Sequence, residues 1–303
     1  MKPVISGSCH SLRLLYPCDD FDYKLVDTGD FKKLELLGSH YVVRPAPQAI
    51  WPRKLPLEDW DKSEAEYEYF KGKQTGGNWR FFSSFPEDGW TLRFQDLTLK
   101  VNPTGFGHIG LFAEQAPNWL WIREQVSLID NPNILNLFGY TGVSTLSAAA
   151  GGARVTHIDA SKPSIAWARQ NQELSRLKDC PIRWIVDDAI KFLKREIRRG
   201  NRYHGIIMDP PTFGRGTKNE VWKIEKDLPE LLELCCQILT PDPSFILITT
   251  HSPGFSSLTL ENLLLSYFLP TRQGVIESGE MFIFENVFKT SLPSGFFSRW
   301  TKN

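Results

Sequence analysis

The segment Asp209-Pro210-Pro211-Thr212-Phe213 carries the clearest potential for chemistry in this sequence. Two prolines after an acid impose an extended, rigid backbone that cannot start a helix at once. Such a backbone holds the Asp209 carboxylate and the Phe213 ring in a fixed arrangement, in which the acid accepts hydrogen bonds from a planar amine and the ring stacks on its face. The alternative interpretation is a loop that the prolines only stiffen.

A second segment, Asn136-Leu137-Phe138-Gly139-Tyr140-Thr141-Gly142, contains two glycines that let the backbone approach a ligand closely and then turn into a helix. The glycines are spaced G-x-x-G, so the dinucleotide fingerprint G-x-G-x-x-G is absent, which argues against NAD. A tight connection between a strand and a helix, with no ligand, is the alternative.

Three further acids follow apolar runs. Asp159 lies seventeen residues beyond Gly142, about where nucleotide-binding α/β units place the acid that accepts from ribose hydroxyls. Alternatively, Asp159 caps the helix that follows, a role that Ser161 can also fill. Of Asp187 and Asp188, one can cap the next helix and the other can face an adenine amino group, and the sequence leaves open which does which.

These segments belong to a stretch, from about residue 126 onward, in which short apolar runs alternate with helical patterns. This alternation is typical of a parallel sheet covered on both faces, whose ligands bind at the carboxyl ends of the strands. The predicted strands are 134–138, 154–159, 182–186, 205–209 and 245–249, and the predicted helices are 143–150, 163–177, 189–199, 225–239 and 258–269. A hairpin of strands 274–277 and 281–289, turning at 278–280, completes a seven-stranded, mostly parallel Rossmann-like sheet.

The first 125 residues have a different sequence pattern, which is rich in aromatic residues and in short runs of alternating apolar and polar residues. Strands are predicted at 23–26, 34–37, 41–43, 90–94 and 97–101. Four prolines between Arg44 and Pro56 exclude regular structure there. We therefore expect a smaller β-rich region at 1–125, serving substrate recognition, and a Rossmann-like α/β domain at 126–303.

The composition, with 303 residues of which 41% are hydrophobic and 23% charged, is that of a soluble globular chain. Thirty-five Lys and Arg balance thirty-five Asp and Glu, so a nucleic-acid substrate would require a local basic patch. The first residues, MKPVISGSCH, do not resemble a signal peptide, and no apolar run is long enough to span a membrane, which favours a cytoplasmic protein.

The cysteines argue against a disulfide framework and against a zinc site, because their number is odd and no C-x-x-C occurs. They are Cys9, Cys18, Cys180, Cys235 and Cys236. Cys235 falls in a helical apolar pattern and is expected in the core.

In order along the chain, LNLFGYTGVSTLSAA (135–149), THIDASKPSIAWARQN (156–171), VDDAIKFL (186–193) and IIMDPPTFGRG (206–216) resemble the motifs of class I S-adenosylmethionine-dependent methyltransferases. The set is most similar to the bacterial family of large-subunit (23S) ribosomal RNA methyltransferases with a DPP-x-F motif, over about residues 100–290. Upstream, GHIGLFAEQAPNW (107–119) resembles the family segment in which a Gln, here Gln115, touches the cofactor.

The resemblance implies a methyltransferase that binds S-adenosylmethionine and releases S-adenosylhomocysteine. The implied cofactor-binding residues are Gln115, Asn136, Phe138, Gly139, Tyr140, Thr141, Gly142, Asp159, Ala160, Ser161, Asn171, Asp188, Ala189 and Asp209. Within this set, residues 136–142 would line the methionine part, Asp159 the ribose and Asp188 the adenine. The implied catalytic wall, shared with the acceptor, is Asp209, Pro210, Pro211 and Phe213.

The expected reaction is direct displacement, in which an acceptor atom attacks the sulfonium methyl group in line, and no metal is required. Methylation at C5 of a pyrimidine would need a Cys nucleophile. No cysteine lies at the DPP motif or after the strand that ends near Thr249, which favours a nitrogen acceptor. His251 is either a base beside the site or a structural residue.

Two basic segments are candidate RNA contacts. The first contains Lys191, Lys194, Arg195, Arg198, Arg199 and Arg202, and its alternative is a solvated helix face. The second interleaves Lys71, Lys73 and Arg80 with Tyr67, Tyr69, Phe70 and Trp79, where bases could stack, unless these rings form a small aromatic core. The glycine-flanked basic loop 214–218 is suited to closing over an anionic substrate.

The expected function is therefore methyl transfer to a base of RNA, with large-subunit ribosomal RNA as the partner. A methyltransferase of a small molecule or of a protein side chain, and a non-catalytic binding module on the same fold, remain the alternatives. The sequence lacks the glycine fingerprint G-x-G-x-x-G that an NAD-dependent dehydrogenase would need. The sequence does not decide between a monomer and a homodimer.

Overall fold

The computed structural model describes residues 13–15, 20–72, 76–82, 85–86, 88–216, 220–268, 273–285, 288 and 290–302. Some sequence features singled out above lie outside the described residues, namely Cys9, Cys18, Lys73, Thr217 and Lys218, together with the predicted ends at residues 269 and 289.

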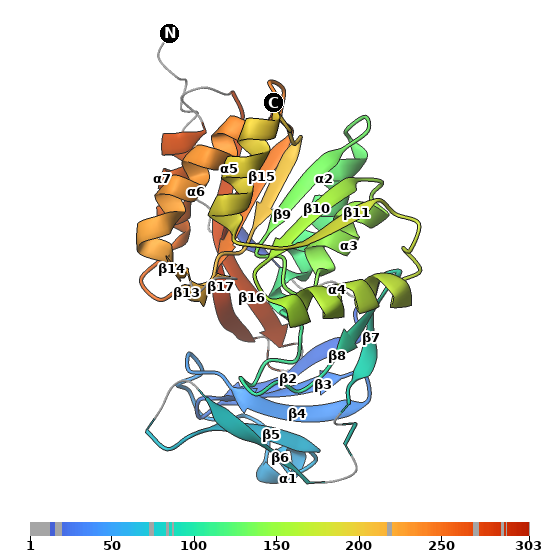
Figure 1. Ribbon diagram of the computed structural model, residues 1–303. Helices are drawn as coiled ribbons and strands as arrows, with labels where there is room; N and C mark the ends of the chain where they lie inside the picture. Colours follow the sequence, from blue (N-terminus) through green and yellow to red (C-terminus); the bar gives the residue numbers. More distant parts are fainter. Residues whose placement is uncertain are drawn as a thin grey trace.

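Seven strands, in the order β11-β10-β9-β12-β15-β17-β16, form the part of the sheet that carries the predicted site residues, and we call this part the catalytic sheet (Figure 1). They are β9 (Asn133–Leu137), β10 (Arg154–Asp159), β11 (Ile182–Val186), β12 (Gly205–Met208), β15 (Phe245–Thr250), β16 (Val275–Glu285) and β17 (Thr290–Thr301). The first five run parallel, and β17 is antiparallel to both of its neighbours. Strand order reverses between β9 and β12, so this fold is expected to bind its ligand there.

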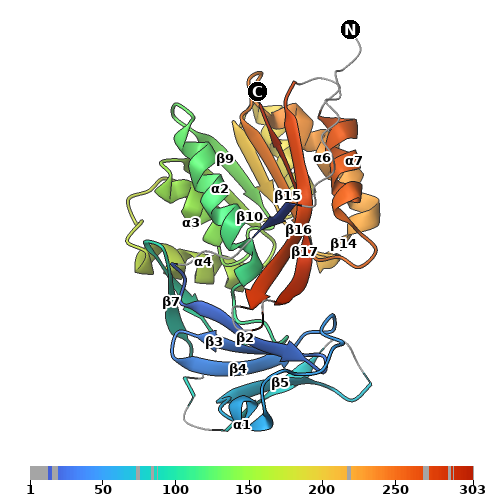
Figure 2. The ribbon, with the colours of Figure 1, turned by 180° about the vertical axis from the view of Figure 1, so that it is seen from behind.

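Helices cover both faces of this sheet because successive strand residues point to opposite sides. Ile134 packs with Ala148 on one face, whereas its neighbour Leu135 packs with Leu193 and Leu231 on the other. The first face carries α2 (Ala116–Ser127) and α3 (Val143–Ala150), and the second carries α5 (Ala189–Arg199), α6 (Ile224–Ile238) and α7 (Ser257–Tyr267) (Figure 2). Helix α4 (Lys162–Leu174) packs against β8, β10 and β11. The predicted fold class is confirmed, and Cys235 is fully buried as expected.

Most strands of the N-terminal region lie together at one end of the catalytic sheet, and we call them the N-terminal layer (Figures 1 and 2). Its elements are β2 (Tyr23–Gly29), β3 (Lys32–Leu37), β4 (His40–Pro45), the short helix α1 (Leu57–Trp60), β5 (Ala65–Tyr69), β6 (Gly77–Phe81) and the hairpin of β7 (Trp90–Phe94) and β8 (Leu97–Val101). Residue Leu25 of β2 pairs with Glu285 of β16, and β1 (Arg13–Leu15) also joins β16. Through these pairings the sheet reaches thirteen strands, so the prediction of a seven-stranded sheet was too small.

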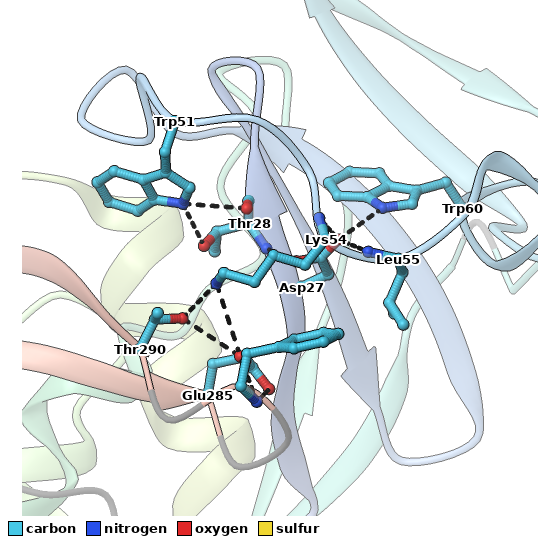
Figure 3. A network of polar contacts seen from close by, with 9 residues as sticks. Asp27, Thr28, Trp51, Lys54, Leu55, Trp60, Glu285 and Thr290 are labelled. Carbon is cyan, nitrogen blue, oxygen red and sulfur yellow. Dashed lines mark hydrogen bonds and ion pairs between the residues drawn. The ribbon is translucent and has the colours of Figure 1, made fainter.

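The buried carboxylate of Asp27 organises the proline-rich connection between β4 and β5 (Figure 3). Its Oδ2 accepts hydrogen bonds from the backbone N–H groups of Lys54 (3.1 Å) and Leu55 (2.9 Å) and from Nε1 of Trp60 (3.0 Å). The Lys54 ammonium then donates to Thr290 of β17 at 2.5 Å. Residues 46–56 are irregular, as the prolines predict, and they join the N-terminal layer to the catalytic sheet. The predicted start of this irregular stretch at Arg44 is wrong, because Arg44 and Pro45 still belong to β4.

The predicted hairpin turn at 278–280 is wrong. Strand β16 passes straight through these residues, with Gly279 opposite Phe297 and with the hydroxyls of Ser278 and Ser298 2.7 Å apart across the ladder. The partner strand β17 was not predicted because Pro293 interrupts its pattern. This proline sits beside the register shift in the ladder, where a bulge accommodates it.

Other elements also escaped prediction: β1, α1, β5, β6, α2, β13 (Phe213–Arg215) and β14 (Val221–Lys223). The expected domain boundary at residue 125 falls within α2. Across the described residues, no helix is both long and apolar enough to cross a membrane.

Candidate active site

The loops that follow β9, β10, β11, β12 and β15 converge on a cavity of about 830 Å³. This volume is in the range of small-molecule sites, and the cavity lies where strand order reverses, as the fold predicts. We call it the cofactor cavity. The predicted site residues that line it are Gln115, Asn136, Phe138, Gly139, Tyr140, Thr141, Asp159, Ala160, Ser161, Asp188, Ala189, Asp209, Pro210 and Pro211.

Three predicted site residues do not line the cofactor cavity. Gly142 caps α3 with a φ of +86°, which only glycine adopts readily, and so shapes the loop from behind. Asn171 is buried, and its amide donates to the carbonyl of Thr141 at 3.0 Å, so it supports the lining without reaching it. Phe213 is 54% exposed because it begins the β13–β14 hairpin, which carries its ring to the surface.

The loop after β9 is tightly built. A Cβ atom at Gly139 would lie 2.3 Å from Cε1 of His157, so no larger residue fits there. The flanking Phe138 and Tyr140 have φ values of +57° and +50°, a strained conformation that concentrates at functional sites. Burial lowers the pKa of His157 to about 3, and this neutral ring meets the hydroxyl of Thr145 at 2.9 Å. The loop is therefore held rigidly at the mouth of the cavity.

Asp159 is fixed by two backbone donors. Its Oδ2 accepts from the N–H of Tyr140 at 2.9 Å, and its Oδ1 accepts from the N–H of Ser161 at 2.7 Å. Burial raises the pKa of Asp159, and the two backbone hydrogen bonds oppose that rise. The cap of α4 is Ser161, whose hydroxyl accepts from the N–H of Ser164, so Asp159 is not the cap. Each carboxylate oxygen keeps a lone pair for a ligand.

The two acids after β11 divide their roles. Asp188 caps α5, since its Oδ1 accepts from the N–H of Lys191 at 2.9 Å. Asp187 accepts from the N–H of Asp188 and forms an ion pair with Arg195. Both line the cofactor cavity, but only Asp188 combines the cap with a second oxygen that can accept from a ligand.

Asp209 is backed by a chain of hydrogen bonds that crosses the core. Nε2 of Gln115 lies 3.3 Å from Oδ2 of Asp209 and 3.0 Å from the hydroxyl of Thr249. The other end of that amide accepts from Asn118 at 2.7 Å, and Asn118 accepts in turn from Arg299 of β17 at 2.6 Å. Gln115 thus uses both ends of its amide within the protein, and the chain orients the Asp209 carboxylate.

His251 lies between two carboxylates. Its Nε2 is 3.1 Å from Oε1 of Glu114, and its Nδ1 is 3.7 Å from Oδ1 of Asp209. Burial would lower the pKa of His251, but the two acids outweigh it and raise the pKa to about 10. This shift favours the protonated ring at neutral pH and argues against the role of a base considered above. Glu114 was not predicted as a site residue, although it lies next to Gln115 in the GHIGLFAEQ segment.

Most basic side chains of the first segment form ion pairs with acidic side chains of the same protein. Lys194 pairs with Glu230 at 2.6 Å, and Arg199 pairs with the buried Glu196 at 2.9 Å. Lys191 also has an acidic partner on a neighbouring loop. These pairs favour the interpretation of a solvated helix face.

In the second basic segment, two of the rings are structural. Tyr67 is buried and donates to the carbonyl of Gly105, and Trp79 donates to the carbonyl of Thr104. Arg80 lies over the ring of Phe82 on the surface. The segment therefore contains a small aromatic core with exposed rings around it. In the described part of the chain, no three His, Cys, Asp or Glu side chains gather as they do in a metal site.

A Rossmann-like sheet with an acid at the end of its second parallel strand, acids after the third and a rigid Asp-Pro-Pro segment after the fourth is typical of α/β proteins that bind a nucleotide or nucleoside at this edge. A family model described as "S-adenosylmethionine-dependent methyltransferase" matches residues 67–252. The crystal structure of an S-adenosylmethionine-dependent methyltransferase from Agrobacterium tumefaciens is 40% identical, covers 97% of this chain and 95% of its own, and superposes with a TM-score of 0.90. The chain belongs to the S-adenosylmethionine-dependent methyltransferase family.

Curated relatives are similar over part of the chain. Ribosomal RNA large subunit methyltransferase K/L of Hahella chejuensis is 37% identical over 143 residues, which cover 46% of this chain and 19% of that protein. Ribosomal RNA large subunit methyltransferase I of Salmonella arizonae is 32% identical over 165 residues, which cover 54% of this chain and 40% of that protein. The chain thus spans about a fifth of the first relative and two fifths of the second.

Proposed function

We propose that this protein transfers a methyl group from S-adenosylmethionine to a base of large-subunit ribosomal RNA. The observation that carries the proposal is the placement of the Asp209 carboxylate, which lines the cofactor cavity and touches the Glu114–His251 pair at its edge. The names of the ribosomal RNA methyltransferases to which part of this chain is similar support RNA as the acceptor.

The cofactor cavity has the chemistry that S-adenosylmethionine requires. Asp159 would accept from the ribose hydroxyls, and the second oxygen of Asp188 would accept from the adenine amino group. The strained loop 136–142, with Asn171 behind it, would hold the methionine part. Ala160, Ser161 and Ala189 would complete the nucleoside pocket, and Gln115 would act through Asp209.

When bound, the cofactor supplies a methyl group that its sulfonium charge has already activated. The contribution of this chain is therefore mainly to position the acceptor, which can lower the barrier by about 7–11 kcal/mol. Pro210 and Pro211 fix the backbone that carries Asp209, and Gln115 fixes its carboxylate. Phe213, at the outer end of this wall, would contact only the periphery of an acceptor.

The carboxylate of Asp209 would hold an N–H of the acceptor and receive its proton as the nitrogen is methylated. The protonated His251 ring would keep that carboxylate in place from the side opposite to Gln115. A nitrogen acceptor also agrees with the three cysteines among the described residues, because Cys235 is buried in the core and neither Cys180 nor Cys236 lines the cavity.

In this proposal, residues 126–303 form the methyltransferase domain and residues 1–125 recognise the substrate. An acceptor of this kind would place the enzyme in the cytoplasm. The test is transfer of labelled methyl groups to ribosomal RNA, offered deproteinised and as large subunits, from cells that lack this protein. We expect one labelled nucleoside. Label in a protein or a small molecule, with none in RNA, would contradict the choice of acceptor but not the enzyme class.

A further inference from the structure

A second cavity of about 640 Å³ adjoins the cofactor cavity, between the N-terminal strands and the ends of the catalytic strands. We call it the junction cavity. The two cavities share the residues Phe106, His108, Leu111, Phe112, His251 and Ser252. The junction cavity therefore reaches His251, whose Nδ1 lies 3.7 Å from Oδ1 of Asp209, where the proposed reaction would occur.

The floor of the junction cavity is a cluster of charges from β3 and β4. The buried Glu35 accepts from Nε of Arg44 at 2.6 Å and from Tyr23 at 2.8 Å, and the Lys33 ammonium lies 3.0 Å away from it. Lys33 has three donors, of which this contact uses one. Buried ion pairs contribute little net stability. A charged floor that faces a cavity is instead suited to a polar ligand.

An exposed aromatic ring stands at the rim. Phe106 is 75% exposed and lines both cavities. The loop that carries it is pinned from three strands: Arg44 donates to the carbonyl of Gly107 (3.3 Å), and Tyr67 and Trp79 donate to the two carbonyls before Phe106. A Cβ atom at Gly107 would lie 2.5 Å from the Tyr67 ring, so the turn is also closely packed. The exposed ring thus stands on a rigid support.

We propose that the junction cavity receives a single nucleobase, extruded from an RNA strand, which stacks on Phe106 and directs its reactive edge toward Asp209. Enzymes that modify a base take it out of its stack into such a pocket, and aromatic rings hold unpaired bases by stacking. Tyr69, at 37% exposure, extends the aromatic rim, and Lys33 donates to a base oxygen from the floor. This inference rests on the proposed function and assigns the acceptor site within it.

The test uses Tyr69→Ala and Lys33→Met in the full chain, because both residues line the junction cavity and neither lines the cofactor cavity. We expect the KM for RNA to rise about 10-fold or more in each variant, with the affinity for S-adenosylmethionine within twofold of the wild type. The matched control is Phe31→Ala, which removes a 60% exposed ring outside both cavities and should leave the KM for RNA unchanged.

Two results would overturn the inference while the proposed function stands: variants that methylate RNA like the wild type, or variants that lose cofactor affinity in step with activity. A wild-type protein that labels no RNA would overturn both. If a variant fails to fold, a photo-crosslinking residue at Phe106 replaces it. We expect crosslinks within a few nucleotides of the methylated base, and crosslinks elsewhere or to no RNA would refute the assignment.

Discussion

Replacing Asp159 by alanine should weaken cofactor binding through the loss of ribose contacts. The carboxylate uses one lone pair on each oxygen for the N–H groups of Tyr140 and Ser161, which leaves acceptors for the ribose hydroxyls. A hydrogen bond to a charged acceptor contributes about 1.5–3 kcal/mol. Because about 1.4 kcal/mol corresponds to a tenfold change, each lost bond should raise the Kd by about 10- to 150-fold.

The assay is calorimetric titration with S-adenosylhomocysteine and with analogues that lack the ribose 2′ or 3′ hydroxyl. The wild type should bind the deoxy analogues more weakly by the factor above, whereas Asp159→Ala should bind all three alike. Ser256→Ala is the control, since it removes a serine helix cap of the same kind at α7, outside the cofactor cavity, and should keep the difference between the ligands. An Asp159→Ala variant that still discriminates against the deoxy analogues would show that the residue only supports the loop.

Three further changes test other parts of the account. Glu114→Gln removes one of the two carboxylates that raise the pKa of His251 to about 10, so the ring should lose its proton at a lower pH. The alkaline limb of the pH–rate profile should therefore move to lower pH, and an unchanged limb would contradict this role of Glu114. Gly139→Ala brings a methyl group to 2.3 Å from His157 and should abolish S-adenosylmethionine binding, as titration would detect. Asp27→Ala leaves buried donors without an acceptor and should lower the free energy of unfolding, measured with denaturant, by about 3–5 kcal/mol. A decrease below about 1 kcal/mol would refute the role of Asp27 in holding the proline-rich connection.

Local patterns predicted the core of the fold because each strand–helix unit satisfies its own periodicity. The five parallel strands and the helices after them appear where their apolar residues repeat. The final hairpin did not follow local preference. Serine and glycine favour turns in many proteins, but here Ser278 and Gly279 lie in β16 and pair with β17. Strand β17 also pairs with β15, and this pairing in the sheet outweighs the local preference for a turn. The link from Leu25 to Glu285 is equally invisible in sequence, because it joins residues far apart in the chain.

Some site residues could be predicted from local sequence and others could not, as with the elements of the fold. Residues at the end of a strand or directly after it, such as Asp159 and Asp209, were predictable since the sheet brings all such positions to one edge. Phe213 was misplaced because the β13–β14 hairpin begins at that residue, and a two-stranded pairing is not readable from three residues. Glu114 and the junction cavity were missed because both depend on how the N-terminal strands dock onto the sheet.

Methyl transfer to ribosomal RNA with Asp209 at the site of reaction can be tested in cells, by nucleoside analysis of large-subunit RNA from a strain without this gene. The strain is complemented with the wild type or with Asp209→Asn. We expect one methylated nucleoside to disappear on deletion, to return with the wild type and to stay absent with the variant, although the variant binds S-adenosylmethionine. Identical RNA in all strains, or full restoration by Asp209→Asn, would contradict it.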